Sequence, residues 1–268
     1  TVKGSLRFQG GQSGTVFHFL QCKRYHGGER VKMKECVLVV DDDREIVKAI
    51  SILLEGEGYE VLKAYDGLKA LDILTTGRVQ LVLIDVMMPK LDGLSALMRI
   101  RQKANIPVIV LSAKSEDTDK VLGLSMGADE YVSKPYNPAE LAARVKSQLR
   151  RYTLLGDIHA GEKVGEITNG RLTYRTDEKV LYADGEAVKL TATETRIIDL
   201  LMRNLGRIFP AEEIYRRVWE EEAFASENTV MVHIRRIREK LELNPKEPEY
   251  IKVVWGIGYK MEKQEKCS

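Results

Sequence analysis

The sequence is poor in three features that would place it in common classes of protein. It contains only three cysteines, Cys22, Cys36 and Cys267, which are too few and too scattered for a disulfide framework or a zinc site. No apolar run approaches the roughly 18 residues that a membrane helix requires. A net charge of only +2 is too small to indicate a nucleic-acid or membrane partner. We therefore expect a soluble, cytoplasmic protein.

The length and composition predict about two folded domains. A domain commonly has roughly 100–200 residues, and this chain has 268. With 44% hydrophobic and 31% charged residues, each domain can bury a core, which excludes disorder as the overall class. The charge is unevenly distributed, with +5 over residues 1–33, −1 over 34–152 and −2 over 153–268. The positive balance therefore comes entirely from the first 33 residues.

Residues 1–33 are basic, contain several glycines and lack regular periodicity, so we interpret them as a disordered tail. The first structural strand is predicted directly after Met33. Translation from Met33 would leave this tail out of the native protein, and a genuine flexible tail is the alternative.

From residue 36 onward, short apolar runs alternate with amphipathic stretches. The apolar runs predict five strands, at residues 36–40, 60–65, 80–84, 106–111 and 130–132. Helical spacing follows each of them, at residues 44–57, 67–75, 94–103, 117–126 and 138–151. Continuous apolar strands are typical of a parallel sheet covered on both faces. Residues 34–152 are therefore expected to form an α/β domain with a doubly wound, five-stranded parallel sheet.

Polar residues stand at the ends of four of these strands. Asp41 and Asp42 follow the first strand, and Asp85 follows the third. Ser112 comes directly after the fourth strand, and Lys134 follows the fifth. Carboxylates that meet at one sheet edge repel each other unless a cation joins them, and hard oxygen ligands suit Mg²⁺. An acidic cluster alone is usually solvated surface, but this combination predicts a site for magnesium and phosphate.

Residues 34–152 resemble the receiver domain of bacterial two-component response regulators. The matching motifs are Val39-Val-Asp-Asp-Asp43, Leu83-Ile-Asp-Val-Met-Met-Pro89 with Asp92-Gly93, Leu111-Ser-Ala113 and Tyr131-Val-Ser-Lys-Pro135. The resemblance implies that Asp85 accepts a phosphoryl group from a sensor histidine kinase, with Lys134 neutralising charge on the phosphoryl oxygens. The implied Mg²⁺ ligands are Asp41, Asp42, Asp85 and the backbone carbonyl of Met87.

The same resemblance implies a conformational switch. Ser112 would move to the phosphoryl group while Tyr131 turns inward, although Tyr131 could equally pack at a strand edge. Lys134-Pro135 is where the family usually has a cis peptide bond. Asp43 matches no ligand position and is expected to cap a helix.

The second part of the chain follows a predicted linker at residues 153–165. Alternating residues predict a small antiparallel sheet, at residues 170–174, 179–182 and 187–190. A capping box at Thr191–Glu194 opens a helix that runs through Met202, and another helix is expected over residues 211–219.

A third helix, over residues 228–241, is predicted to bury one stripe and expose a basic face. The buried stripe consists of Val230, Ile234, Ile237 and Leu241. The basic residues are Arg235, Arg236, Arg238 and Lys240, opposed only by Glu239. Basic residues on a helix usually form a solvent-exposed face without a binding function. Here two strands around a glycine-containing turn, at residues 250–259, follow the helix, and a helix with a wing is a DNA-reading arrangement.

Residues 166–263 resemble the winged-helix output domain of the OmpR/PhoB family, and residues 250–259 are similar to regulators of the VanR type. A short tail is expected at residues 264–268. The resemblance implies contacts with double-stranded DNA by Thr229, His233, Arg235, Arg236, Arg238, Lys240 and Trp255. His233 could instead be structural. Trp255 stands where the family often has an arginine, so it could pack on sugars or within the domain.

Both resemblances together imply a regulator of transcription that is not an enzyme. Phosphorylation would favour a homodimer, which sets two recognition helices on repeated half-sites of DNA. The charged residues expected at the dimer surface are Lys120, Asp129, Glu130, Glu140, Arg144 and Arg151. The loop at residues 220–227 lies where members of the family can touch RNA polymerase.

Two other classes of protein remain open. An enzyme that uses a phosphoaspartate normally has an acid–base Asp two residues after the nucleophile, but Met87 stands there. A DNA-binding architectural protein that does not depend on phosphorylation would leave the acidic pocket without a purpose.

Overall fold

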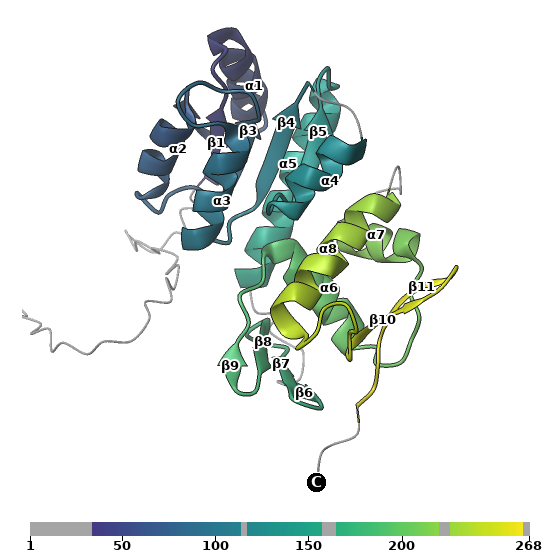
Figure 1. Cartoon of the computed structure of the whole chain (residues 1–268). Coiled ribbons are helices and arrows are strands. Elements are labelled where there is room, and N and C mark those ends of the chain that lie inside the picture. Colours follow the sequence, from purple (N-terminus) through teal and green to yellow (C-terminus); the bar gives the residue numbers. More distant parts are fainter. Residues whose placement is uncertain (1–33, 114–116, 157–164, 220–225, 265–268) are drawn as a thin grey trace, which may run out of the picture. The chain divides into compact units, whose positions relative to one another are not determined.

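Strands and helices alternate through the first part of the chain, as the sequence predicts (Figure 1). The computed structural model describes residues 34–113, 117–156, 165–219 and 226–264. The strands of this part are β1 (Cys36–Val40), β2 (Glu60–Ala64), β3 (Leu81–Asp85), β4 (Val108–Ser112) and β5 (Glu130–Ser133). Its helices are α1 (Arg44–Gly56), α2 (Gly67–Leu74), α3 (Gly93–Lys103), α4 (Asp117–Ser125) and α5 (Pro138–Gly156).

These strands form one parallel sheet in the order β2-β1-β3-β4-β5, which confirms the predicted doubly wound α/β architecture. Every residue of β1, β3 and β4 is buried, because helices cover both faces of the sheet. Alternate residues of β1 enter different cores: Leu38 packs in one apolar cluster, and Val37 packs in the other. The packing on both faces fixes the carboxyl ends of these strands beside one another.

The first helix begins as the sequence predicts. Asp43 is its N-cap, and its carboxylate accepts hydrogen bonds from the backbone N–H groups of Glu45 and Ile46. The last helix of this part differs from the prediction, because α5 continues beyond Arg151 to Gly156. Tyr152 packs against the apolar cluster of the sheet, which extends the helix into the predicted linker. Residues 157–164 of that linker lie outside the described residues.

The described residues of the second part of the chain form two antiparallel sheets and three helices. The elements are β6 (Glu166–Asn169), β7 (Leu172–Arg175), β8 (Val180–Ala183), β9 (Glu186–Ala187), α6 (Ala192–Met202), α7 (Ala211–Trp219), α8 (Ser226–Leu241), β10 (Ile251–Val254) and β11 (Gly258–Met261). The sheet β6-β7-β8-β9 precedes the helices, and the hairpin β10-β11 follows them. This arrangement agrees with a winged helix.

Two strand predictions for this part were wrong. The strand β6 was not predicted, and it pairs along its whole length with β7. The predicted strand at 187–190 ends at Ala187, because Leu190 packs in the core and the next residue, Thr191, already caps α6. The predicted capping box is confirmed, since Thr191 and Glu194 exchange side-chain and backbone hydrogen bonds.

The helix α8 has apolar residues on more than one face. Val230, Ile234, Ile237 and Leu241 are all buried in the core of the second part, which confirms the predicted stripe. Val232 is also buried, but it packs with the apolar cluster beside the parallel sheet. The described residues from Lys34 onward belong to one compact unit, in which α4 lies against α8 (Figure 1). Within the described ranges, none of the helices is long and apolar enough to cross a membrane.

Candidate functional site

A lysine and two carboxylates meet at the carboxyl edge of the parallel sheet. The Lys134 ammonium, directly after β5, lies 2.7 Å from Asp41 Oδ2 and 2.6 Å from Asp85 Oδ1. Both carboxylates are almost fully buried, while about a fifth of the Lys134 side chain is exposed. The three strand ends therefore bring together the groups that the sequence pattern predicted for one site.

The backbone around Asp85 fixes the position of its carboxylate. The N–H of Met87 donates a hydrogen bond to Asp85 Oδ2 at 2.5 Å, while Lys134 donates to Asp85 Oδ1, so both carboxylate oxygens are held by donors. The loop then returns closely to β3, and a Cβ added at Gly93 would lie 1.9 Å from the Asp85 carbonyl oxygen. Glycine is therefore required at this close approach, which accounts for the predicted Asp92-Gly93 motif.

The electrostatic balance of this pocket favours an additional cation. Burial raises the pKa of Asp41, and its hydrogen bond from Lys134 offsets this only in part. Burial also disfavours the charge on Lys134, but hydrogen bonds to Asp41 and Asp85 outweigh it and raise the pKa of the ammonium. Asp42, next to Asp41, is exposed. One ammonium thus faces two buried carboxylates with a third acid beside them.

The oxygen ligands of this pocket fit Mg²⁺ as an open site. Among the described residues, no group of three or more His, Cys, Asp or Glu side chains forms a closed metal cage. Mg²⁺ commonly binds through one or two carboxylates and keeps several waters. Asp41 and Asp85 both contact the same ammonium, so two carboxylates face one small region at this edge of the sheet.

The predicted switch residues lie near this pocket but in different surroundings. Ser112 ends β4 and is fully buried, and its carbonyl accepts a hydrogen bond from Lys134 N at 2.7 Å. Tyr131 is only partly buried, and its ring lies so close to Gly123 that an added Cβ there would be 2.9 Å from Tyr131 Cδ2. The Lys134-Pro135 peptide bond is cis, as expected.

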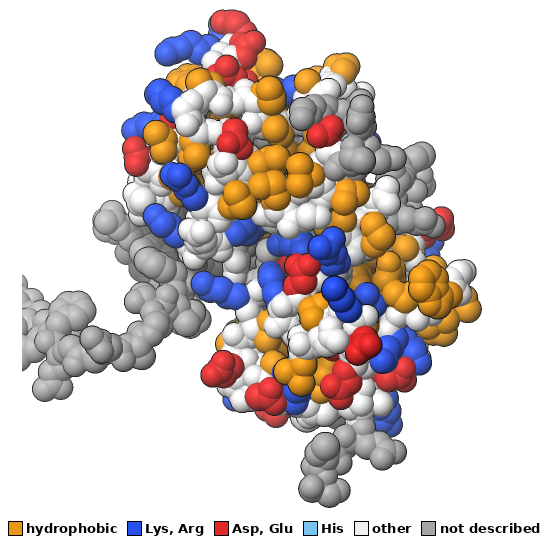
Figure 2. All heavy atoms as spheres, viewed as in Figure 1, with side chains coloured by type: hydrophobic (Ala, Val, Ile, Leu, Met, Phe, Trp, Pro, Cys, Tyr) orange, Lys and Arg blue, Asp and Glu red, His pale blue; other side chains and the backbone are white. Residues whose placement is uncertain are grey.

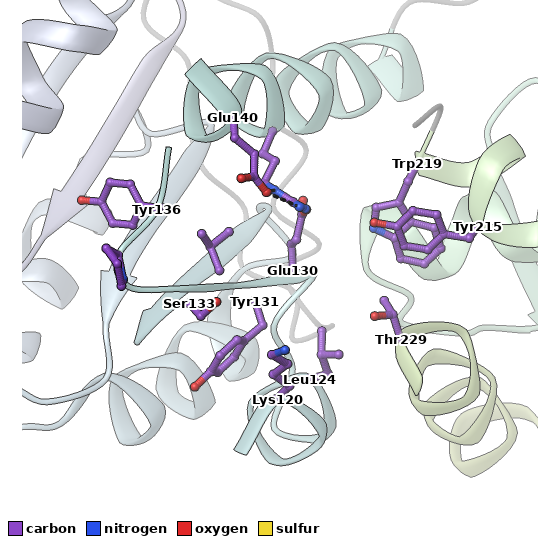
Figure 3. A pocket seen from close by; sticks show the side chains of 13 residues that line it. Lys120, Leu124, Glu130, Tyr131, Ser133, Tyr136, Glu140, Tyr215, Trp219 and Thr229 are labelled. Carbon is purple, nitrogen blue, oxygen red and sulfur yellow. Dashed lines mark hydrogen bonds and ion pairs between the residues drawn. The ribbon is translucent and has the colours of Figure 1, made fainter. Parts of the chain in front are cut away.

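A cavity of about 200 Å³ separates Tyr131 from the second part of the chain (Figure 3). The close-up shows Tyr131, Lys120 and Glu130 on one side, opposite the rings of Tyr215 and Trp219. These two rings stack with their centroids 4.8 Å apart. Thr229 of α8, one of the residues expected at DNA, lines the same cavity. The predicted switch and the predicted DNA-binding helix therefore border one space.

Two of the residues expected to face DNA are buried, so the prediction of one exposed basic face was wrong for this arrangement. His233 is fully buried and Arg236 is 7% exposed. Arg236 Nη2 lies 3.0 Å from Glu194 Oε1, and the His233 ring packs against Trp219 with centroids 5.4 Å apart. Burial was not predicted because the residues that cover them lie far away in the sequence.

Other basic residues of α8 are also bound to protein groups. Arg238 donates two hydrogen bonds to the Ile251 carbonyl, at 2.7 and 3.0 Å. Lys240 lies 2.6 Å from Glu194 Oε2. The local positive charge predicted for α8 is therefore partly neutralised by Glu194. Arg235 remains exposed and pairs at 3.0 Å with Glu239 on the same helix.

The tip of the wing is apolar and exposed. Trp255 is 91% exposed, and Val253 and Ile257 are also exposed. Figure 2 shows hydrophobic side chains gathered at the tip of the β10-β11 hairpin and Lys and Arg side chains over α8. Trp255 is thus not packed within the domain, and the other alternative, packing on the sugars of DNA, stays a prediction.

Most residues expected at a dimer surface form ion pairs within the chain. Arg144 lies 2.7 Å from Glu140 Oε1 and also pairs with Glu130. Asp129 is fully buried and pairs with Arg101 at 2.6 Å. Lys120 is partly buried and lines the cavity. The side chain of Arg151 and the loop at 220–225 lie outside the described residues.

The sequence analysis missed three residues that organise α8 and its surroundings. Glu194 was identified only as part of a capping box, but it also pairs with Arg236 and Lys240. Thr193 donates a hydrogen bond to Asp129 at 3.0 Å, and Arg101 pairs with the same carboxylate. No local spacing could reveal these contacts, because the partners are 28–64 positions apart in the chain.

Comparisons with known proteins agree with both resemblances. The chain matches a family described as response regulator receiver domain over residues 37–146 and a second one, described as transcriptional regulatory protein, C terminal, over residues 185–261. It is 41% identical to the regulatory protein VanRc of Enterococcus gallinarum, covering 86% of this chain and 100% of that protein. It is 43% identical to the uncharacterized transcriptional regulatory protein YcbL of Bacillus subtilis (strain 168), covering 84% and 99%.

A solved structure of a RitR mutant has the same fold, with a TM-score of 0.68 and 23% identity over 85% of this chain and 99% of that one. The sheet order, the winged helix and the two matched families point to one conclusion. The chain belongs to the two-component response regulators of the OmpR/PhoB family, and it is a phosphorylation-dependent, DNA-binding regulator of transcription.

Proposed function

We propose that Asp85 accepts the phosphoryl group from a phosphohistidine of the cognate sensor kinase. The observation that carries this proposal is the Lys134 ammonium placed between Asp41 and Asp85, at 2.7 and 2.6 Å. An ammonium in this position can neutralise charge on a phosphoryl group attached to Asp85. Asp85 ends a buried strand, and its carboxylate is anchored by the N–H of Met87. The nucleophile is therefore held in one orientation before the donor arrives.

The chemical step exchanges one bond to phosphorus for another. An oxygen of Asp85 forms a bond to phosphorus while the phosphorus–nitrogen bond of the phosphohistidine breaks. The departing imidazole keeps the bond electrons and takes up a proton. Lys134 stays charged throughout, because its hydrogen bonds to both carboxylates raise its pKa.

In this proposal Asp41, Asp42, Asp85 and the backbone carbonyl of Met87 hold Mg²⁺, which supplies further neutralisation of the phosphoryl oxygens. The raised pKa of Asp41 supports this assignment, since it indicates that Lys134 alone does not compensate the buried carboxylates. Ser112 and Tyr131 act as the switch that senses the phosphoryl group.

The output is DNA binding by a homodimer on repeated half-sites. Of the expected set, Arg235, Lys240 and Trp255 are exposed in this structure, and Thr229 and Arg238 are partly buried. His233 and Arg236 are buried and complete the set after rearrangement. The dimer surface comprises Lys120, Asp129, Glu130, Glu140, Arg144 and Arg151. We assign contact with RNA polymerase to the loop at 220–227.

The acceptor is tested with purified protein, Mg²⁺ and acetyl phosphate as the phosphodonor. Asp85→Asn should abolish incorporation of phosphate, as measured by intact mass. Asp43→Asn is the matched control, because Asp43 is an exposed N-cap and asparagine caps a helix equally well. Undiminished incorporation in Asp85→Asn would refute the assignment.

A further inference from the structure

The loop that follows Asp85 contains a strained turn at Lys90. The backbone of Lys90 has a φ of 66°, a left-handed conformation that is uncommon for a residue other than glycine. The Leu91 N–H donates a hydrogen bond to the Pro89 carbonyl at 2.8 Å, which closes a three-residue turn around Lys90. Three-residue turns with a positive φ at the centre are rare and strained. Neighbouring contacts therefore have to hold this turn in place.

The side chain of Lys90 ties the turn to the first residue of the helix α2. Its ammonium lies 2.6 Å from Asp66 Oδ2. Asp66 Oδ1 accepts a hydrogen bond from the N–H of Lys69 at 2.8 Å and caps α2. The hydrogen bond from Lys90 holds the pKa of Asp66 below its usual range, so the carboxylate is charged at neutral pH. Because α2 already fixes Asp66, the ion pair restrains mainly the loop.

A backbone contact joins the same two segments. A Cβ added at Gly67, the first residue of α2, would lie 2.6 Å from the carbonyl oxygen of Leu91. The turn around Lys90 thus packs directly on the start of α2, which lies beside α3 (Figure 1). Leu91 itself is buried. The ion pair and this close approach hold the loop from two sides.

The same loop carries the groups that orient Asp85. The Met87 N–H donates to Asp85 Oδ2 at 2.5 Å, and the Gly93 N–H donates to the Val86 carbonyl at 3.0 Å. Lys90 lies between Met87 and Gly93 in the chain. A displacement of the turn at Lys90 therefore moves the segment that supplies the hydrogen bond to Asp85.

We propose that Lys90 is a positioning residue for the pocket of Asp41, Asp85 and Lys134. Its ion pair with Asp66 fixes the loop, so that the Met87 N–H stays on Asp85 and the Met87 carbonyl stays available to Mg²⁺. This inference rests on the proposed function, in which Asp85 is the acceptor and Met87 supplies a ligand. Lys90 acts through Met87 and has no contact of its own with the phosphoryl group.

The direction of the change in cation affinity separates positioning from simple electrostatics. Lys90 carries a positive charge, so by Coulomb's law alone its loss strengthens the binding of a divalent cation, whereas loss of the negative charge of Asp66 weakens it. If the pair positions the loop, loss of either partner weakens cation binding, because either loss frees the turn. Lys90 is therefore the informative position, since the two explanations give opposite signs there.

The test uses the full-length chain with Mn²⁺ as the probe, because Mn²⁺ suits the same carboxylate, carbonyl and water ligands as Mg²⁺. Electron paramagnetic resonance measures the free Mn²⁺. Lys90→Met removes the ammonium and keeps a long side chain, and Asp66→Asn removes the charge and keeps a residue that caps α2. Lys63→Met is the matched control, since Lys63 is exposed and makes a looser pair with Glu55, at 3.7 Å.

Lys90→Met and Asp66→Asn should each raise the Kd for Mn²⁺ about fivefold, the upper end of what a partly exposed ion pair contributes. The double variant should match the single variants, because one substitution already removes the pair. Amide exchange at Met87, followed by nuclear magnetic resonance, should become several-fold faster in both variants and stay unchanged in Lys63→Met. If circular dichroism shows that Lys90→Met is unfolded, Lys90→Gly replaces it, since glycine adopts a positive φ without strain.

Unchanged or tighter binding of Mn²⁺ in Lys90→Met would overturn the positioning role. The proposed function has a separate readout, which is incorporation of phosphate from acetyl phosphate into the wild-type chain, measured by intact mass. If the wild-type chain is phosphorylated and Lys90→Met binds Mn²⁺ normally, Asp85 remains the acceptor and the role of Lys90 is wrong. If the wild-type chain is not phosphorylated but both variants bind Mn²⁺ less tightly, Lys90 positions the cation site and the assignment of the acceptor is wrong.

Discussion

The proposed phosphoryl pocket and the proposed DNA-binding helix α8 differ in how far their side chains are already arranged to meet a partner. In the pocket, Asp41, Asp85 and Lys134 already contact one another at the edge of a sheet, and Lys134 and Asp42 keep the pocket accessible to solvent. On α8, Arg236, Arg238 and Lys240 are engaged with protein groups. Under the proposed function, the pocket of Asp41, Asp85 and Lys134 can react without rearrangement, whereas α8 has to exchange protein partners for DNA.

This difference follows from how each site is built. The pocket takes its residues from the ends of neighbouring strands, whose positions are fixed by packing on both faces of the sheet. The basic face of α8 depends on which surface the helix packs against, and polar surfaces of this kind can have more than one stable arrangement. Regulation is therefore expected to act on α8 and to leave the pocket unchanged.

The largest effect is expected from removing the lysine of the pocket. Lys134→Met keeps a long apolar side chain but leaves Asp41 and Asp85 without their shared cation. Because the charge on the transferred phosphoryl group is then less compensated, the rate of phosphorylation by acetyl phosphate should fall about 100-fold or more. Lys48→Met is the control, since Lys48 is an exposed residue of α1 that makes only a 4.0 Å pair with Glu45. If the phosphorylation rate of Lys134→Met falls less than threefold, Lys134 does not prepare the pocket for the phosphoryl group.

A smaller effect, on the free energy of unfolding, is expected from neutralising Glu194, the buried acid beside α8. Glu194 is fully buried, and its two oxygens pair with Arg236 and Lys240. Burial alone would raise the pKa of Glu194, but these two cations outweigh it and lower the pKa. Glu194→Gln leaves the buried Arg236 uncompensated, so the free energy of unfolding should fall by about 3 kcal/mol.

Chemical denaturation with urea measures this change, and Glu239→Gln provides the control. Glu239 pairs with Arg235 in solvent, and such surface pairs contribute roughly 0–1 kcal/mol. If the free energy of unfolding falls by the same small amount in both variants, Glu194 does not pair with Arg236 in solution. The statement that α8 is engaged with protein groups while the pocket is open would then lose its main support.

The sequence predicted the pocket more completely than the arrangement of α8. Residues such as Asp41, Asp85 and Lys134 could be placed together because strand ends in a parallel sheet share an edge. The stripe from Val230 to Leu241 was equally predictable, since it depends on helical periodicity. Neither the shared edge of strand ends nor helical periodicity predicts the position of Arg236, because its partners belong to α4, α6 and the segment after α4.

Helical periodicity also identifies only one buried side of a helix. Val232 and His233 lie off the predicted stripe, and they are buried because α8 has a second neighbour. In the same way, the strand β6 was missed because its partner β7, and not a distinctive pattern of its own, stabilises it. Contacts between distant segments are what the sequence alone did not supply.

The smallest expected effect is a pH dependence of the packing of α8 against α4, and the group responsible is the buried His233. Burial lowers the pKa of His233 to about 4 from the ordinary value of 6.5, and Arg236 on the same helix acts in the same direction. Glu194 on α6 and Asp129, directly before β5, act in the opposite direction. Neighbouring cations outweigh burial at both carboxylates and lower their pKa values, which favours their charged forms. His233 is therefore the group that titrates as the pH falls from neutral.

Lowering the pH should weaken this packing, because protons bind preferentially to the form in which His233 is exposed. Chains in which α8 is packed against α4 keep His233 neutral, whereas chains in which His233 is exposed protonate it near its ordinary pKa of 6.5. Between about pH 6.5 and pH 4 the exposed form therefore binds more protons, and the packing of α8 against α4 weakens as the pH falls through this window. Above pH 6.5 this contribution is constant. At pH 5 the packing should be weaker by up to about 2 kcal/mol than at pH 7.5. Hydrogen exchange over residues 228–241, corrected for the intrinsic effect of pH, measures the change. His233→Phe should remove the dependence, and a dependence that persists unchanged in this variant would show that another group controls the release of α8.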